Sequence, residues 1–326
     1  MVDKIRVAFI YKPDYPFLTG QHFDNTTYYF FMKALKRNSK LNVEYFPSKH
    51  KFDISKLKNN FDLILIPDNL NEGTPDELIG IRESKLPVIS RVGDFHDVQR
   101  KGKLPYDKKY KIDYYFNFMH EDYFYRFYPQ NLKYQTIVFG IEPELYQNTP
   151  SFKNRKKNSI LNSGAVGNPK LKSRLANRIL NPKKSGWYFY NLRTKCNSLE
   201  YVDYFGMKNN SYRYSNYFEL LTKYRTSIAA TTFYPTIKYW ESTASGCLTF
   251  MEITKKNRGS YLGFKDNETA IIINDENYET KFKEYLNSPD DPKWETIAEA
   301  GRKFSLEKFS NDVAVESLVK LMNNIL

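Results

Sequence analysis

The stretch KYWESTASGCLTF, residues 238–250, joins a helix pattern to a strand pattern. At about 100° per residue, Ile237, Trp240 and Ala244 form one apolar arc of a helix. Gly246 predicts the end of that helix, and the apolar run CLTFME that follows predicts a buried strand. The stretch therefore predicts a helix packed on a sheet.

Glu241 lies on the edge of this apolar arc, where a packing residue is expected. Burying an ionised carboxylate without partners costs several kcal/mol, so a buried Glu241 must accept hydrogen bonds. The residues leave the donor open. If the helix is turned outward, water is the donor. An ion pair with Lys238 or with a more distant basic residue is the second alternative, and the two hydroxyl groups of a sugar diol are the third.

Short apolar runs alternate with helical or loop segments along the whole chain. In the first half we expect strands at residues 5–11, 42–46, 62–67, 87–92, 113–119 and 134–140. In the second half we expect strands at residues 158–164, 186–191, 226–232, 247–252 and 269–274, interleaved with helices at 168–180, 215–224, 237–245 and 278–287. This alternation predicts an α/β fold of two Rossmann-like, doubly wound domains in tandem.

The join between the two halves is expected in EPELYQNTPSFKNRKKNS, where the hydrophobic periodicity lapses. We predict an N-terminal Rossmann-like domain over residues 1–150 and a C-terminal one over residues 151–308. Residues 309–326 predict a final amphipathic helix, which can pack on either domain, including back on the N-terminal one.

The composition describes a globular protein. A chain of 326 residues with 41% apolar residues is long enough for two cores. No run of about 18 apolar residues and no signal-peptide pattern occurs, which predicts a cytoplasmic protein. Cys196 and Cys247 lack Cys or His neighbours at metal-ligand spacing, so we expect reduced structural thiols.

The net charge of +13 is unevenly distributed. Residues 145–199 contain no acidic side chain and twelve basic ones: Lys153, Arg155, Lys156, Lys157, Lys170, Lys172, Arg174, Arg178, Lys183, Lys184, Arg193 and Lys195. Such a window attracts phosphate, an anionic lipid surface or nucleic acid, unless it is a solvated basic face. Charge alone does not choose among these anions.

The segment LNSGAVGNPKLKSR, residues 161–174, is a candidate diphosphate site. In doubly wound sheets, ligands bind beyond the carboxyl ends of strands, and Ser163 and Gly164 follow an expected strand there. Lys170 and Arg174 lie in the first turns of the helix that follows. Glycine allows close backbone approach and the cations complement phosphate, although the spacing matches no Walker or dinucleotide motif.

Three segments of the first half follow expected strands and carry candidate acceptor-side or catalytic residues. Asp94 and His96 lie in SRVGDFHDVQRK, where the histidine offers a general base, a sugar-binding side chain or a structural hydrogen bond. His120 in FMHEDYF is a weaker candidate for the base. Gly20 and His22 lie in a long loop before a helix. None of these spacings is a recognised metal-ligand motif.

The chain resembles GT-B glycosyltransferases, and its pattern is most similar to the CgeB-like, family 4-related group. The resemblance rests on LNSGAVGNPKLKSR, on the segment IKYWESTASGCLTFMEITKKNRGSYLGFKDNETAIII and on the later AEAGR helix, so it covers roughly residues 155–310. Over residues 1–150 it is mainly architectural. It implies the GT-B fold, with a deep cleft between the two domains.

The resemblance implies a donor site in the second domain and an acceptor site in the first. Glu241 corresponds to the helix glutamate that accepts hydrogen bonds from the ribose of a nucleotide sugar, and Gly164 to the turn that faces the diphosphate. The donor-binding set expected from it is Ser163, Gly164, Lys170, Arg174, Lys238, Tyr239, Glu241 and Ser245. The expected donor is a UDP- or GDP-sugar, with no metal and no tightly bound cofactor, because cations neutralise the leaving diphosphate.

One position departs from the family pattern. Many family 4 members carry a second glutamate eight residues before the helix glutamate, and this chain has Phe233 there. A mechanism drawn from those retaining members therefore does not transfer directly. An inverting enzyme needs a general base, for which His96 and Asp94 are preferred here over His120.

The prediction is a metal-independent glycosyltransferase of the hexosyltransferase type. It moves a sugar from a nucleoside diphosphate sugar to a hydroxyl acceptor on a glycan, a lipid-linked molecule or a surface polymer. The basic window predicts peripheral contact with the anionic inner face of a membrane. The alternative is a non-catalytic Rossmann-like module that binds nucleic acid or an anionic polymer. Nucleic acid is the less expected partner, and the sequence leaves the oligomeric state open.

Overall fold

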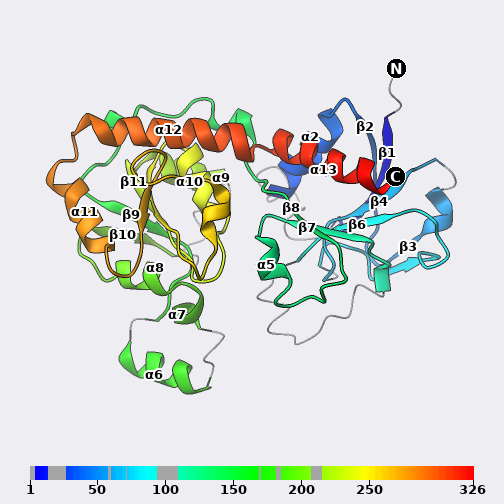
Figure 1. Ribbon diagram of the computed structural model, residues 1–326, viewed down its shortest axis with the longest axis horizontal. Helices are drawn as coiled ribbons and strands as arrows, with labels where there is room; N and C mark the ends of the chain where they lie inside the picture. The colour runs from blue at the N-terminus through cyan, green and yellow to red at the C-terminus, as the bar shows by residue number, and fades with distance from the viewer. Residues whose placement is uncertain are drawn as a thin grey trace. The chain divides into compact units, whose positions relative to one another are not determined.

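In the computed structural model the chain forms two compact units (Figure 1). Unit 1 consists of Met1–Glu142 and Ser310–Leu326, and unit 2 of Pro143–Phe309. The structure describes residues 4–13, 27–57, 60–70, 72–93, 109–168, 170–180, 185–206 and 215–326. Each unit is built on its own parallel sheet.

Unit 1 contains a six-stranded sheet in the order β2-β1-β4-β6-β7-β8, and every pairing within it is parallel. Its strands are β1 (Ile5–Tyr11), β2 (Leu41–Pro47), β4 (Leu63–Ile66), β6 (Val88–Arg91), β7 (Tyr114–Asn117) and β8 (Tyr134–Thr136), and β3 (Lys51–Asp53) pairs with β5 (Glu77–Ile79) in a small second sheet. Its helices are α2 (Thr27–Arg37), α5 (Glu121–Phe124), α13 (Asn311–Ile325) and the 3-10 turn η1 (Ile54–Leu57).

The C-terminal helix α13 packs on α2 within unit 1 (Figure 1). Val315, Leu318 and Met322 of α13 belong to the same buried cluster as the strands of this unit. Arg37 adds ion pairs to Glu142 at 2.8 Å and to Asp312 at 2.6 Å. The last segment of the chain therefore completes the core of the unit in which the chain begins.

Unit 2 contains a five-stranded parallel sheet in the order β10-β9-β11-β12-β13. The strands are β9 (Ile160–Ser163), β10 (Val202–Phe205), β11 (Thr226–Ala229), β12 (Leu248–Glu252) and β13 (Ile271–Ile273). The helices are α6 (Leu171–Leu180), α7 (Gly186–Phe189), α8 (Asn191–Cys196), α9 (Ser215–Thr222), α10 (Lys238–Ala244), α11 (Tyr278–Asn287) and α12 (Pro292–Phe309), with 3-10 turns η2 (Pro143–Tyr146), η3 (Phe152–Asn154) and η5 (Gly259–Leu262).

Helices cover both faces of the unit 2 sheet. Successive residues of a strand point to opposite faces, and β9 shows this directly. Ile160 packs with Leu192 of α8, whereas Leu161 packs with Leu220 and Leu221 of α9. Strands that are apolar on both faces are typical of parallel sheets with two helical layers. The predicted α/β fold of Rossmann-like, doubly wound domains is therefore confirmed.

The strand expected at residues 186–191 is wrong. The aromatic run GWYFYN, which favours a strand by composition, forms α7 and the first residue of α8. Ser185 caps α7, because its Oγ accepts a hydrogen bond from the Tyr188 amide at 3.3 Å. The sheet position beside β9 is taken instead by β10, which the sequence interpretation did not include.

Gly301 allows α12 to pass close to the backbone before β13. A Cβ atom at Gly301 would lie 2.3 Å from the Thr269 carbonyl oxygen, which no side chain tolerates without a shift of the backbone. We expect Gly301→Ala to lower the free energy of unfolding by about 1–3 kcal/mol through overpacking. Chemical denaturation would measure it, and Lys303→Ala on the exposed side of α12 is the control. Equal midpoints for the two variants would contradict this packing account.

Candidate functional site

Polar residues gather at the carboxyl edge of the unit 2 sheet, where four neighbouring strands end. Ser163 ends β9, Thr231 and Thr232 follow β11, Glu252 ends β12 and Asn274 follows β13. All of them except Asn274 are buried. Ligands of open parallel sheets bind at this edge, which makes it the candidate ligand site of unit 2.

The turn after β9 is formed by Gly164 in the left-handed region, with φ of 91°. Its amide donates a hydrogen bond to the Phe205 carbonyl at 3.0 Å, which ties the turn to the end of β10. A Cβ atom at Gly164 would lie 3.0 Å from Nζ of Lys238 and 3.7 Å from a terminal nitrogen of Arg193. Glycine is therefore suited to this position for two reasons: it adopts the left-handed conformation, and it has no Cβ atom to obstruct the two cations.

Lys238 is the first residue of α10 and its ammonium group lies under this turn. Its Nζ donates to Oγ of Ser163 at 2.8 Å, to the Ser163 carbonyl at 3.2 Å and to the Tyr217 hydroxyl at 3.2 Å. Burial lowers the pKa of Lys238 to about 7, and the positive charge of Arg193 acts in the same direction. Within the described residues, the hydrogen bonds of this ammonium group therefore go to uncharged oxygens.

Glu241 lies one helical turn after Lys238 on α10. Burial raises the pKa of Glu241 to about 7, and Lys238 opposes that shift. Over the residues that the structure describes, no hydrogen bond or ion pair reaches the Glu241 carboxylate. The ion pair with Lys238 that the sequence left open does not form, because Lys238 is bonded to Ser163 instead. The acid thus has unused acceptor capacity beside a half-buried cation.

Arg193 of α8 is a second buried cation at the same turn. Only 2% of its surface is exposed, and its guanidinium group stacks on the Tyr190 ring at 4.1 Å. Its Nε has no hydrogen-bond partner, and within the described ranges no carboxylate pairs with it. Burial lowers the pKa of this guanidinium. A buried charge without a paired carboxylate is costly, so an anion bound at this turn would be stabilised by two neighbouring cations.

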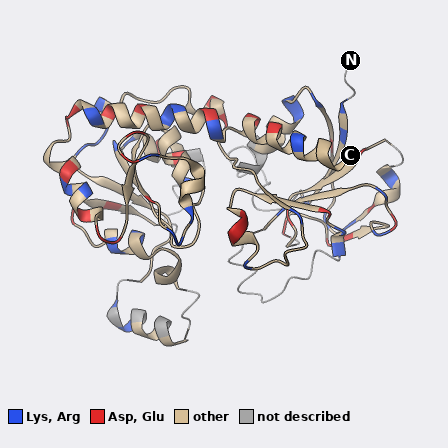
Figure 2. Ribbon diagram, viewed as in Figure 1, with Lys and Arg blue, Asp and Glu red and all other residues tan. Residues whose placement is uncertain are grey.

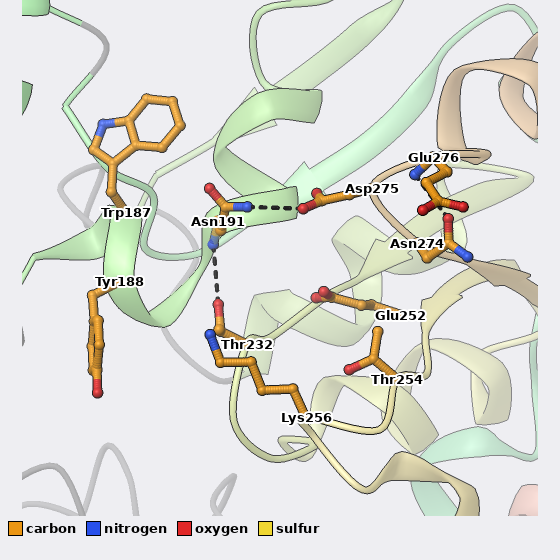
Figure 3. Close-up of a pocket in the computed structure, with 10 residues that line it drawn as sticks. All are labelled: Trp187, Tyr188, Asn191, Thr232, Glu252, Thr254, Lys256, Asn274, Asp275 and Glu276. Carbon is orange, nitrogen blue, oxygen red and sulfur yellow. Dashed lines mark hydrogen bonds between the residues drawn. The ribbon is translucent and has the colours of Figure 1, made fainter.

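A pocket of about 420 Å³ opens beside the turn on the same edge (Figure 3). Its lining consists of Trp187, Tyr188, Asn191, Thr232, Glu252, Thr254, Lys256, Asn274, Asp275 and Glu276. Asn191 connects two sides of the pocket. Its backbone N–H donates to Oγ1 of Thr232 at 3.3 Å, and its side-chain Nδ2 donates to Oδ2 of Asp275 at 3.2 Å. Burial raises the pKa of Glu252 to about 8, and the charge of Asp275 adds to this effect. The pocket combines aromatic rings with polar groups, as carbohydrate sites do.

The structure brings four of the expected donor-binding residues together: Ser163, Gly164, Lys238 and Glu241. Tyr239 and Ser245 are fully buried. The Tyr239 hydroxyl accepts from the Thr231 amide at 3.1 Å and donates to the Glu252 carbonyl at 3.0 Å, whereas Ser245 donates to the Ser242 carbonyl at 2.7 Å. The Tyr239 side chain therefore joins the ends of β11 and β12 at this edge, whereas Ser245 bonds within the last turn of α10, before β12 begins.

The remaining expected donor residues lie on or next to α6. Lys170 is exposed just before the helix, and its amide donates to the Asn168 side chain at 3.0 Å. Arg174 is part of α6, and its side chain lies outside the described part of the structure. The cations observed at the Gly164 turn are thus Lys238 and Arg193, which come from α10 and α8.

Among the acceptor-side and catalytic candidates, only His120 falls within the described residues. It is the N-cap of α5, where its Nδ1 accepts a hydrogen bond from the Asp122 amide at 3.2 Å. Gly20, His22, Asp94 and His96 lie outside the described residues. Across the residues described, no three His, Cys, Asp or Glu side chains gather in a metal-binding group. Within the same ranges, no helix is long and apolar enough to cross a membrane.

Sequence reasoning missed Arg193 and Glu252. Arg193 is one of twelve basic residues in its window, and only burial distinguishes it from a solvated side chain. Glu252 had a usable signal, because an acid directly after a buried strand lies at the edge where doubly wound sheets bind ligands.

Neither a protein-family model nor a curated protein matches the chain. Solved structures do match it over nearly its whole length. Sucrose-phosphate synthase from Thermosynechococcus elongatus has a TM-score of 0.59 at 12% identity and covers 99% of both chains. A glycosyltransferase from Rickettsia africae has 0.57 at 10% identity, covering 99% of this chain and 98% of that one. The Anabaena protein HepE in complex with UDP-glucose has 0.56 at 13%, covering 98% and 100%. This chain therefore has the GT-B fold that these glycosyltransferases share.

Proposed function

We propose that the protein is a glycosyltransferase that takes a sugar from a nucleoside diphosphate sugar and transfers it to a hydroxyl acceptor. The observation that carries this proposal is the pair of cations beside the Gly164 turn, half-buried Lys238 and buried Arg193. Glu241 lies one helical turn after Lys238, and no described residue forms an ion pair with its carboxyl group. The fold supports it, because solved structures of this shape include glycosyltransferases, one of them with UDP-glucose bound.

Each part of the cluster has a task in this reaction. The backbone of Gly164 lets the diphosphate approach closely, and Lys238 exchanges its bonds to Ser163 for phosphate oxygens. Arg193 lies almost wholly below the surface and acts through the field it adds to the turn. Glu241 accepts hydrogen bonds from the two ribose hydroxyls. These cations stabilise the charge of the departing diphosphate, so the proposed reaction needs no metal.

In the transfer step, the acceptor oxygen forms a bond to the anomeric carbon of the sugar while the bond from that carbon to the phosphate oxygen breaks. The electron pair leaves with the diphosphate, and the acceptor proton passes to a base or to the leaving group. We place the acceptor with unit 1, with Gly20 and His22 on its side. Asp94 and His96 are the preferred candidates for the base, with His120 third. Membership in the CgeB-like, family 4-related group belongs to the same proposal.

The proposal is tested by incubating the protein with UDP-glucose, GDP-mannose and dTDP-glucose and measuring release of the free nucleotide. Slow hydrolysis is expected for at least one donor even without the acceptor, because water can replace a hydroxyl acceptor. No release from any donor, together with affinity for DNA or RNA that falls steeply with salt, would instead support a nucleic-acid-binding module.

We also propose that α6 contacts an anionic membrane surface. Leu175, Ile179 and Leu180 are 51%, 77% and 75% exposed, which is unusual for large apolar side chains of a helix. Figure 2 shows no acidic residue on the described part of α6, and its sequence LKSRLANRIL carries three basic residues. An exposed helix that combines cations with large apolar side chains matches the interface of an anionic bilayer.

Sedimentation with vesicles tests this contact. The protein is expected to bind vesicles that contain phosphatidylglycerol and not vesicles of phosphatidylcholine alone. The double variant Leu175→Glu with Ile179→Glu should reduce binding at least about tenfold, because it replaces apolar contacts by repelled charges. Val313→Glu, at an exposed position in the first turn of α13, is the matched control. Equal binding by the two variants would exclude α6 as the contact.

A further inference from the structure

The 420 Å³ pocket is acidic in a chain with a net charge of +13. Three of its ten lining residues, Glu252, Asp275 and Glu276, carry carboxyl groups, and Lys256 is its one basic residue. Asp275 pairs with Lys195 at 3.1 Å, whereas within the described residues neither Glu252 nor Glu276 forms an ion pair. The pocket therefore differs in charge from the cationic turn at Gly164.

Glu252 is the member of this set whose environment requires an explanation. It ends β12, only 8% of its surface is exposed, and its Oε2 has no hydrogen-bond partner. Figure 3 shows its carboxyl group directed into the space between the labelled side chains. Buried polar atoms in folded proteins are almost always paired, so a carboxyl oxygen that has no partner and lines a pocket indicates a ligand with hydrogen-bond donors.

The pocket and the Gly164 turn are adjoining parts of one edge. Gly167 lies in the segment that follows the turn, and a Cβ atom there would be 2.5 Å from Cδ1 of Trp187, which lines the pocket. Asn191 of the pocket and Arg193 of the turn are two residues apart on α8. A ligand that places its diphosphate at the turn can therefore extend into the pocket. An acidic pocket repels the diphosphate itself, so the part that enters must be uncharged or cationic.

We infer that this pocket receives the sugar of the donor and that Glu252 is a specificity-determining residue that restricts the donor to neutral or amino sugars. The inference rests on the proposed function. Sugar hydroxyl or amino groups supply the hydrogen-bond donors that Glu252 lacks, and the rings of Trp187 and Tyr188 suit the apolar face of a pyranose. Above the pKa of Glu252, a sugar that carries a carboxylate places a like charge next to the ionised Glu252, Asp275 and Glu276, which disfavours its binding.

The test compares two donors that differ only at one carbon of the sugar. A thermal-shift screen first identifies the nucleotide that binds, and titration calorimetry then compares UDP-glucose with UDP-glucuronic acid, or GDP-mannose with GDP-mannuronic acid. At about pH 9, where Glu252 is above its pKa and ionised, the uronic acid donor is expected to bind about a hundredfold more weakly than the neutral one, because of like-charge repulsion in a partly buried pocket. Glu252→Gln keeps the shape of the side chain and should reduce this ratio to tenfold or less, with the affinity for the nucleoside diphosphate unchanged.

Two further variants keep the test decisive. Lys256→Gln changes an exposed side chain and removes the one cation of the pocket, so it should increase the discrimination against the uronic acid. Glu268→Gln, an exposed acid outside the pocket, should leave the ratio unchanged. Equal affinities for the two donors, or a ratio that responds to neither Glu252→Gln nor Lys256→Gln, would overturn the inference while the donor proposal stands. If no nucleotide binds at all, the donor proposal fails and this inference with it.

Discussion

Replacement of Lys238 by methionine is expected to weaken binding of the nucleoside diphosphate by about 30-fold to 150-fold. The estimate corresponds to about 2–3 kcal/mol for a charge-assisted hydrogen bond lost from a partly desolvated site. Methionine keeps the length of the side chain and removes the ammonium group that now bonds to Ser163 and Tyr217. Titration calorimetry measures the change, and Lys223→Met, at an exposed lysine of the same unit, is the control.

The same lysine predicts how the affinity depends on pH. Burial places the pKa values of Lys238 and Glu241 both near 7 in the free protein, and the diphosphate binds best to a protonated lysine. As pH rises from 7 to 9, free Lys238 loses its proton, so binding must take up a proton and the affinity falls. The methionine variant should bind weakly and should lose the fall in affinity that Lys238 causes over this range. A wild-type affinity that rises from pH 7 to 9 would contradict the assignment of Lys238 to the diphosphate.

Replacement of Glu241 by glutamine is expected to lower transfer by about tenfold to a hundredfold. This corresponds to about 1.5–3 kcal/mol in charged hydrogen bonds to the ribose hydroxyls. The carboxylate has no partner in the described structure, so the loss should appear in donor binding and turnover rather than in unfolding. Glu219→Gln, an exposed acid on α9, is the control for charge.

A donor that lacks the ribose hydroxyls separates this role from a general effect of charge. The wild type should bind the 2′,3′-dideoxy nucleotide about as weakly as Glu241→Gln binds the normal one. The variant should hardly distinguish the two nucleotides, because the interacting partner is already gone. If Glu241→Gln loses as much affinity for the dideoxy nucleotide as for the normal one, Glu241 does not hold the ribose.

The sequence predicted the elements whose pattern reflects burial on a regular period. The strand at 247–252 and the helix before it appear as β12 and α10. Gly246 ends the helix with φ of 77°, and the short apolar run after it forms a buried strand. GWYFYN misled the interpretation, because an aromatic-rich run suits a strand and a short capped helix equally well.

The candidate site was predictable only in part, for a related reason. Glu241 and Lys238 share one helix, so their spacing alone places them together. Arg193 approaches the Gly164 turn from α8, and its contact depends on how that helix packs against the sheet. Lys170 was expected at the diphosphate because it follows the turn in sequence, but α6 begins after it and the residue is exposed. Proximity in the chain was thus a poor guide where the packing of a separate helix decided the contact.

The most direct test of the central claim, that the Gly164 turn binds a nucleoside diphosphate, is a thermal-shift measurement with UDP, GDP, CMP and dTDP on the wild type and on Lys238→Met. A ligand that binds only the native state raises the melting temperature, by an amount that corresponds to about 2.7 kcal/mol of added stability at a hundred times Kd. We expect at least one nucleoside diphosphate to raise the melting temperature of the wild type and the shift nearly to disappear in Lys238→Met. No shift with any of the four nucleotides, or an equal shift in the variant, would contradict it.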